Sequence, residues 1–282
     1  MSVEAGRISV FGTESRKLNA FLRRDLLIAW SYRLSFISDW INMLVQVVVF
    51  NFVGKLIDPD VVAKLGFGAG VSYLEFAAVG IALSSFMAIA LGRVNTVIRQ
   101  EQVQGTLESL LLTPTAFTTI QMGSVVYDIV YVPIRTLIFL GMTTLVFGAS
   151  YNWSGLGPAL GILIVYIPFV WGIGIVAAAW TLTFKRGTGV VGLLTTAITL
   201  MSGAYFPIDV LPTWLQGPAK ILPMTIALKG IREAMLAHAG WAHILPVIGI
   251  LAPCAVVSLG LGTLAFRAAF TRERRRGTLG LY

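Results

Sequence analysis

The chain has 282 residues, of which 56% are hydrophobic and only 12% are charged, and its mean hydropathy is +0.82. Soluble globular domains carry about a quarter of their residues as charged ones, so this composition excludes a soluble globular protein and indicates a membrane protein. The formal net charge of +8 is unevenly distributed, because most lysines and arginines flank one side of the apolar segments. That asymmetry is typical of membrane topology and not of a nucleic-acid-binding surface.

Six apolar stretches approach the roughly 20 residues that a helix needs to cross a hydrocarbon core about 30 Å thick. They are Phe36–Ile57, Ser72–Gly92, Ile120–Gly148, Gly157–Phe184, Thr188–Phe206 and Ile244–Phe266. We therefore predict an all-α membrane protein with a six-span transmembrane domain over residues 36–266. A cytoplasmic N-terminus (1–35) precedes it and a basic cytoplasmic tail (267–282) follows it. The positions of the arginines and lysines predict that both termini lie in the cytoplasm.

Residues Arg16–Trp30 have the pattern of an amphipathic helix that lies on the membrane surface. Its apolar and basic positions fall on opposite sides of a helical wheel: Leu18, Phe21, Leu22 and Leu26 against Arg23 and Arg24. A basic face opposite an apolar face suits cytoplasmic lipid headgroups. The simpler alternative is that these charges are only the positive flank of the first span.

Polar residues occur inside the first and third predicted spans. Asn42 and Gln46 are four residues apart and therefore share one helix face. Lipid cannot satisfy such groups, so we expect this face to bond a neighbouring helix, with the lining of a substrate path as the alternative. Asp128 and Arg135 are separated by about 10 Å of helical rise, with Pro133 between them. We expect these two charges to have structural partners on other helices, with a proton relay or a substrate contact as the alternative.

A polar hairpin, residues 93–118, follows the second span. Gly105 breaks the helix that continues from that span, and a short helix then begins at Thr106 with Glu108 in its first turn, where the helix dipole favours a carboxylate. The three successive leucines of this helix have no bilayer to enter on the cytoplasmic side: Leu110, Leu111 and Leu112. They predict that the helix docks into a groove of a partner protein. Packing onto this chain's own surface helix is the alternative.

The segment 203–241, before the last span, is apolar but rich in proline. Four prolines between residues 207 and 223 forbid one continuous helix, and the apolar content does not suit an open aqueous loop. Short helices that re-enter the outer face of the membrane satisfy both facts, provided that protein covers their backbones. Residues Thr225–Ala237 form the most helical part of the segment.

The sequence shows no catalytic or metal-binding pattern. It lacks the GxxxxGK[ST] phosphate loop, the HExxH motif and any pair of cysteines, since Cys254 stands alone. A GxGxxG match at Gly187, Gly189 and Gly192 follows no strand, so close helix packing is the better interpretation, as it is for Gly172. We therefore expect a transport subunit with no metal, and an intramembrane enzyme is the weakest alternative.

Two motifs resemble the permease subunit of type 2 ABC exporters. The pattern ExxxGTLExLLLTP begins at Glu101, and the pattern SGxYFPIxxLPxWLQ followed by LPMTIALKGIR begins at Ser202. The resemblance covers essentially the whole chain, and Arg-Arg-Asp at 23–25 with Trp-Ser-Tyr at 30–32 is similar to the drug and lipid exporter branch. It implies a coupling helix seated on a separate ATPase subunit, formed by Glu101, Gly105, Thr106, Leu107, Glu108, Leu110 and Leu111.

The same resemblance implies roles for three further groups of residues. Arg16–Trp30 is expected to be the interface helix beside the coupling helix. The paired re-entrant helices are expected to form a gate, with these candidate residues: Tyr205, Phe206, Pro207, Pro212, Trp214 and Pro223. Asn42, Gln46 and Phe50 are candidate residues of the pathway lining, although aromatic residues in spans more often serve packing.

We therefore expect the permease subunit of an ATP-driven exporter that moves hydrophobic or amphipathic substrates out of the cytoplasm or the inner leaflet. A drug, a lipid or a lipid-linked glycan fits that description. The resemblance implies an ABC ATPase subunit that binds ATP and Mg²⁺, a second permease copy or a paralogue, surrounding membrane lipid, and a bacterial inner membrane. No cofactor on this chain and no nucleic acid are expected. The alternative is a channel or receptor that works without a motor.

Overall fold

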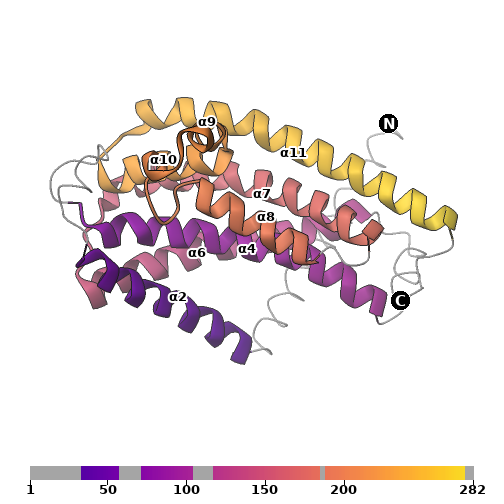
Figure 1. Cartoon of the computed structure of the whole chain (residues 1–282), viewed down its shortest axis with the longest axis horizontal. Coiled ribbons are helices and arrows are strands. Elements are labelled where there is room, and N and C mark those ends of the chain that lie inside the picture. Colours follow the sequence, from indigo (N-terminus) through magenta and orange to yellow (C-terminus); the bar gives the residue numbers. More distant parts are fainter. Residues whose placement is uncertain (1–32, 57–70, 104–116, 185–187, 277–282) are drawn as a thin grey trace, which may run out of the picture.

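The computed structural model describes residues 33–56, 71–103, 117–184 and 188–276, and these are helical apart from short connections (Figure 1). The long helices are α2 (Arg33–Gly54), α4 (Tyr73–Val103), α6 (Phe117–Phe147), α7 (Leu156–Phe184), α8 (Thr188–Met201) and α11 (Trp241–Arg276). The short ones are η2 (Trp153–Gly155), η3 (Ile208–Val210), α9 (Thr213–Ile221) and α10 (Pro223–Leu236). The predicted all-α class is confirmed for these residues.

Successive long helices run in opposite directions along the long axis of the molecule (Figure 1). The short helices α9 and α10 lie at the end where α8 finishes and α11 begins, here called the α10 end. Two short helices in this segment agree with the prediction that its prolines divide it, and α10 coincides closely with the expected helix Thr225–Ala237.

Three described helical stretches are long and apolar enough to cross a membrane: Tyr73–Gly92, Trp153–Phe184 and Trp241–Arg272. Shorter apolar stretches fall at the other predicted spans: Trp40–Gly54, Tyr131–Phe147 and Gly189–Met201. Several apolar helices of this kind make the chain a multi-pass membrane protein. The count of six spans stays a prediction.

One predicted boundary is wrong. The fifth span was expected to reach Phe206, but α8 ends at Met201 and the chain turns at Gly203, whose φ of +77° suits glycine. Helix α11 continues to Arg276, so residues 267–276 of the predicted cytoplasmic tail are helical, and the point where the tail leaves the membrane stays a prediction. Residues 263–276 contain no glycine or proline, so nothing in the sequence stops the helix there.

Several predicted elements lie outside the described residues. The interface helix Arg16–Trp30 and the coupling residues from Gly105 to Leu111 belong to this group. Glu101 lies in α4 and Asp128 in α6, but the described side chains do not include theirs.

Helix α4 is the centre of the bundle. It contacts α2, α6, α7, α8 and α10, and 83% of its apolar stretch is buried inside the protein. The core of the bundle is formed by the largest fully buried side chains, which include Phe86 of α4, Phe139 of α6 and Trp171 of α7. Helix α11 is peripheral, because only 17% of its apolar stretch is buried and it packs mainly on α7.

A capping box fixes the start of α4. The backbone N–H of Ser72 donates to Glu75 Oε2 at 2.8 Å, and the N–H of Glu75 donates to Ser72 Oγ at 3.3 Å. Glu75 Oε1 also accepts from the N–H of Ser150 at 2.7 Å, in the connection after α6. The carboxylate is 5% exposed, so these bonds satisfy a charge that would otherwise be costly to bury.

Close approach of α7 and α11 depends on small residues. A Cβ atom on Gly172 would overlap Ser258, and one on Gly262 would lie 2.6 Å from the carbonyl oxygen of Gly172. The close approach predicted for Gly172 is therefore confirmed. The one predicted for the GxGxxG match is wrong for Gly189 and Gly192 within the described part of the chain, since a Cβ there meets no atom within 4 Å.

Candidate functional site

A cleft of about 390 Å³ lies between α2, α4, α6 and α8. Its lining mixes hydrogen-bonding and apolar side chains: Asn42, Gln46, Ser84, Ser85, Arg135, Thr195, Thr196 and Thr199 with Met43, Ala88, Ile89, Leu200 and Tyr205. Polar groups in an apolar bundle face protein, water or a ligand, because lipid cannot bond them. The cleft can therefore hold a molecule that has both apolar and hydrogen-bonding parts.

Helix α2 brings Asn42 and Gln46 to the cleft from one side. Asn42 is exposed and Gln46 is half-buried, whereas Met43 between them is 3% exposed and packs into the bundle. The two amides thus lie at the edge of the cleft and not in a helix–helix contact. This position favours the pathway-lining interpretation, and their role in transport stays a prediction.

Hydroxyl groups of α4 and α8 supply the opposite walls. Thr195 Oγ1 donates to the carbonyl of Val191 at 2.8 Å, and Ser84 Oγ donates to the carbonyl of Gly80 at 2.8 Å. Because each hydroxyl already donates to its own helix, its oxygen remains an acceptor toward the cleft. Sequence reasoning missed these residues, although the spacing of Thr195 and Thr199 places both on one face of α8.

Arg135 places a cation at the wall that α6 contributes. Its side chain is 6% exposed, and Nη2 donates to Met43 Sδ of α2 at 2.8 Å. A contact with another helix agrees with the expectation that this charge has a structural partner across the bundle. The guanidinium also makes the cleft electrostatically favourable for electron-rich groups.

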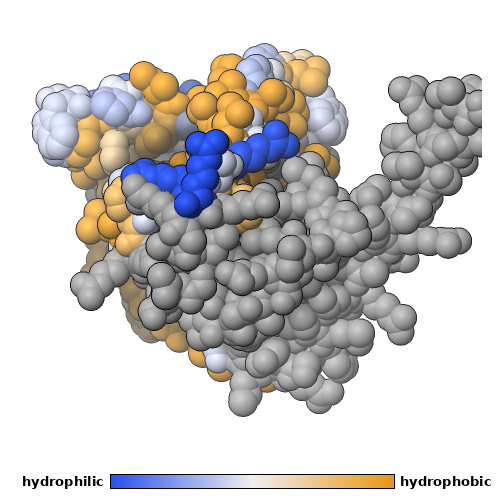
Figure 2. Space-filling model, turned by 90° about the vertical axis from the view of Figure 1, so that its right-hand side faces the viewer, coloured by the Kyte–Doolittle hydropathy of each residue, from blue (hydrophilic) through white to orange (hydrophobic). Residues whose placement is uncertain are grey.

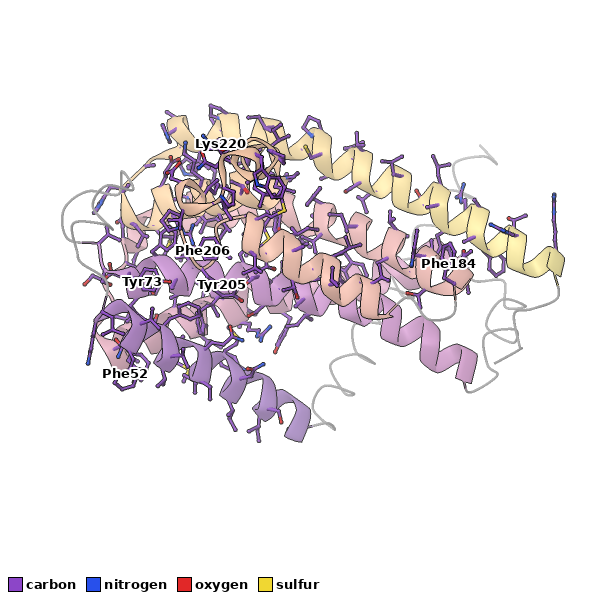
Figure 3. The ribbon with its side chains drawn as sticks, viewed as in Figure 1. Phe52, Tyr73, Phe184, Tyr205, Phe206 and Lys220 are labelled. Atoms are coloured by element: carbon purple, nitrogen blue, oxygen red, sulfur yellow. The ribbon has the colours of Figure 1, made fainter. Side chains whose placement is uncertain are left out.

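An aromatic cluster adjoins the cleft toward the α10 end, where Tyr205 is part of the lining. The rings of Phe50 in α2 and Tyr205 after α8 are stacked, with centroids 5.1 Å apart and an interplanar angle of 4°. Tyr73 Oη donates to the carbonyl of Tyr205 at 2.6 Å, and the Tyr73 ring lies 6.2 Å from that of Phe50. Figure 3 shows Tyr73 and Tyr205 together at this end, far from Phe184. Phe50, a candidate residue of the pathway lining, and Tyr205, a candidate residue of the gate, are therefore in contact.

The other candidate gate residues have different positions. Pro207 and Pro212 precede η3 and α9, and Pro223 is at the first position of α10. Proline costs no hydrogen bond at a helix start, so these residues set where the short helices begin. Phe206 is half-buried beside Tyr205 (Figure 3), whereas Trp214 is 73% exposed. None of these five residues lines the cleft.

Sequence reasoning missed the strongest polar contact at the α10 end, which Arg232 of α10 makes. This side chain is 4% exposed. Its Nη1 donates to the carbonyl of Gly203 at 2.9 Å, and its Nη2 donates to the carbonyl of Ala204 at 2.9 Å. Nη2 and Nε also donate to the carbonyl of Phe76 at 3.0 and 3.3 Å. One guanidinium thus joins α10, α4 and the turn after α8.

The surroundings of Arg232 fit its side chain closely. The guanidinium carbon lies 3.4 Å from the centre of the Phe76 ring, a cation–π contact in a desolvated place. Gly80 leaves the necessary room, because a Cβ atom there would overlap the carbonyl oxygen of Ala204 and lie 2.9 Å from Arg232 Nη2. The available sequence signal was a cation that shares one helix face with Leu228 and Leu236, four residues to either side.

The sequence profile described as ABC-2 type transporter matches residues 16–236. Linearmycin resistance permease protein LnrN of Bacillus subtilis (strain 168) is 28% identical over 201 residues, which cover 71% of this chain and 51% of that protein. The chain therefore spans about half the length of that relative. Nodulation protein J of Rhizobium leguminosarum bv. viciae is 27% identical over 233 residues, covering 79% and 88%. Its counterpart in Rhizobium meliloti (strain 1021) is 25% identical over 233 residues, covering 79% and 87%.

Proposed function

The chain belongs to the ABC-2 type transporter family, and we propose that it is the permease subunit of an ATP-driven exporter for amphipathic molecules. A drug, a lipid or a lipid-linked glycan, taken from the cytoplasm or the inner leaflet, has the required character. The observation that carries this proposal is the cleft, whose amides, hydroxyls and guanidinium lie next to apolar side chains. A relative named as a linearmycin resistance permease supports a permease role.

The free energy for transport has to come from another subunit. The sequence has no phosphate loop, so ATP and Mg²⁺ would bind to a partner ABC ATPase. The partner would hold the coupling helix through Glu101, Gly105, Thr106, Leu107, Glu108, Leu110 and Leu111. Three of these side chains are leucines, which suit a protein groove better than cytoplasm.

Helix α4 offers a direct mechanical path from that contact to the cleft. It is one helix of 31 residues, about 46 Å long, and hairpin residues 93–103 form its last part. Its first turns hold Tyr73 and Phe76, which bond Tyr205 and Arg232 at the α10 end. A displacement of the hairpin would thus reach the α10 end of the cleft through a single rigid element.

Release of the substrate requires the aromatic cluster to separate. Opening the cleft toward the α10 end means breaking the stack of Phe50 on Tyr205 and the hydrogen bond from Tyr73. A hydrogen bond and an aromatic pair contribute about 1 kcal/mol each. Opening therefore costs little compared with the free energy of ATP hydrolysis, so ATP binding on the partner can drive it.

A second permease, either another copy or a paralogue, completes the proposed complex. Apolar side chains on α2 and α8 beside the cleft are exposed, among them Ile41, Val45, Leu193 and Leu194. A second subunit there would cover these side chains and enclose the polar lining of the cleft. The α10 end would then face outward, with both termini in the cytoplasm.

The experiment is reconstitution of the tagged chain with the ATPase that co-purifies with it. The assay follows ATP-dependent movement of a fluorescent phospholipid across liposomes. Glu108→Arg should abolish transport and stimulation of the ATPase while leaving membrane insertion intact. Gln46→Leu, which removes one amide from the cleft, should slow transport roughly three- to tenfold, the worth of one hydrogen bond. Leu145→Ile, at an exposed residue of α6 that does not line the cleft, is the matched control. Uphill transport by this chain alone would refute the proposal.

A further inference from the structure

The exposed face of α11 changes from apolar to basic along its length. Val257, Leu261 and Leu264 are 58%, 58% and 65% exposed. Their spacing of four and three residues places them on one stripe of the helix. At about 100° per residue, Arg272 and Arg275 continue the same stripe toward the end of α11. The helix therefore carries an exposed apolar track that ends in cations.

The basic end of this stripe is hollowed. The described lining of this open hollow comes from one helix: Arg267, Ala268, Thr271, Arg272 and Arg275. These described lining residues include no acidic side chain. Thr271 donates its hydroxyl proton to the carbonyl of Arg267 at 2.8 Å, so its oxygen remains an acceptor. Figure 2 looks onto this end of the molecule and shows hydrophilic surface bordered by hydrophobic surface.

We infer that this stripe binds an anionic phospholipid. Its acyl chain would lie along Val257, Leu261 and Leu264, and its phosphate would be held by Arg267, Arg272 and Arg275. Guanidinium groups bind phosphate in a bidentate manner, and their long side chains reach up or down to the headgroup level. An exposed apolar track with cations at one end is complementary to a molecule with an acyl chain and an anionic head.

Two further observations favour lipid over an acidic protein surface. Helix α11 is the peripheral helix, since only 17% of its apolar stretch is buried and its main neighbour is α7. The apolar track therefore faces away from the bundle and adjoins the cations directly. An acidic partner protein would use the arginines but would leave Leu261 and Leu264 uncovered. The site is also separate from the cleft, which α11 does not line.

The test compares lipid retention by the purified full chain in detergent. The protein is titrated with dioleoylphosphatidylglycerol or dioleoylphosphatidylcholine, and native mass spectrometry measures the bound lipid. A basic residue near a membrane surface contributes about fivefold to the affinity for anionic lipid. The variant R267Q/R272Q/R275Q should therefore lose on the order of a hundredfold in affinity for phosphatidylglycerol and keep its affinity for phosphatidylcholine. K55Q/K220Q/K229Q, which removes three exposed cations near the α10 end, is the charge-matched control and should bind as the wild type does.

Each of the next three outcomes would overturn the inference. Equal retention of the two lipids by the wild type would show that the stripe does not select an anionic head. An equal loss in both triple variants would show a general effect of net charge. Unchanged lipid retention together with loss of the co-purifying ATPase from R267Q/R272Q/R275Q would assign the arginines to protein docking. The fold loss of phosphatidylglycerol affinity in R267Q/R272Q/R275Q should be the same in a Gln46→Leu background, because lipid held in the cleft does not contact these arginines. This test therefore stands apart from the one for transport.

Discussion

Replacing Arg232 by methionine tests whether one buried guanidinium holds the α10 end together. The carbonyls of Gly203 and Ala204 would lose the donors that Arg232 supplies at 2.9 Å. Each buried carbonyl left unsatisfied costs about 1–3 kcal/mol. The contact with the Phe76 ring, 3.4 Å from the guanidinium carbon, adds about 2 kcal/mol when desolvated. Since a charge no longer has to be buried, part of this loss is recovered.

We therefore expect Arg232→Met to lower the free energy of unfolding by about 3–5 kcal/mol. At roughly 2–4 °C per kcal/mol for a chain of this size, the Tm should fall by roughly 10 °C. Arg232→Lys should be intermediate, because a single ammonium lacks the planar fork that reaches three carbonyls at once. The measurement is the fraction of protein that stays monodisperse on size-exclusion chromatography after heating in detergent.

Lys229→Met is the matched control, on the same helix and one turn earlier. The Lys229 side chain is 74% exposed and makes only a 3.9 Å ion pair with Glu233. Exposed ion pairs of this kind add little stability, so its Tm should stay within roughly 2 °C of the wild type. The reasoning fails if Arg232→Met melts like this control, because buried carbonyls cannot lose their donors without cost.

Two further predictions use the same thermal assay. Gly262→Ala should lower the Tm by roughly 5 °C or more, because its Cβ would lie 2.6 Å from the Gly172 carbonyl oxygen, while Gly260→Ala meets no atom within 4 Å and should be neutral or slightly stabilising. Identical melting of these two variants would contradict the close approach of α7 and α11. Glu75→Ala should cost about 2–4 kcal/mol, because two backbone N–H groups, one of them in Ser150, lose a buried acceptor. Glu75→Gln should restore part of that loss, and a wild-type Tm for Glu75→Ala would contradict the cap.

Parts of the candidate site could be predicted because their signals are local. A polar pair at helical spacing, Asn42 and Gln46, identified one face of the first span, and the structure brings that face to the cleft. The prolines likewise predicted where the chain would break, and Pro223 stands at the first position of α10. Aromatic residues near the ends of two predicted spans, Phe50 and Tyr205, were candidates for lining and gating, and they stack on each other.

Other parts depend on contacts between distant residues and could not be read from the chain. Arg232 bonds a carbonyl 156 positions earlier in the sequence, and carbonyls carry no sequence signal at all. The hydroxyls of α8 look like ordinary apolar-helix residues until α2 is placed opposite them. The small residues of the GxGxxG match suggested close packing, yet Gly189 and Gly192 have open space around them within the described chain.

By itself, the sequence determined that this is a helical membrane protein, where most of its helices lie, and which segment the prolines would divide. Each of these follows from composition, periodicity and turn chemistry, which act over a few residues. Only the tertiary structure decided that four helices leave a mixed cleft among them, and that one arginine joins three segments at the α10 end. Those features come from side chains and carbonyls that meet only after the helices pack.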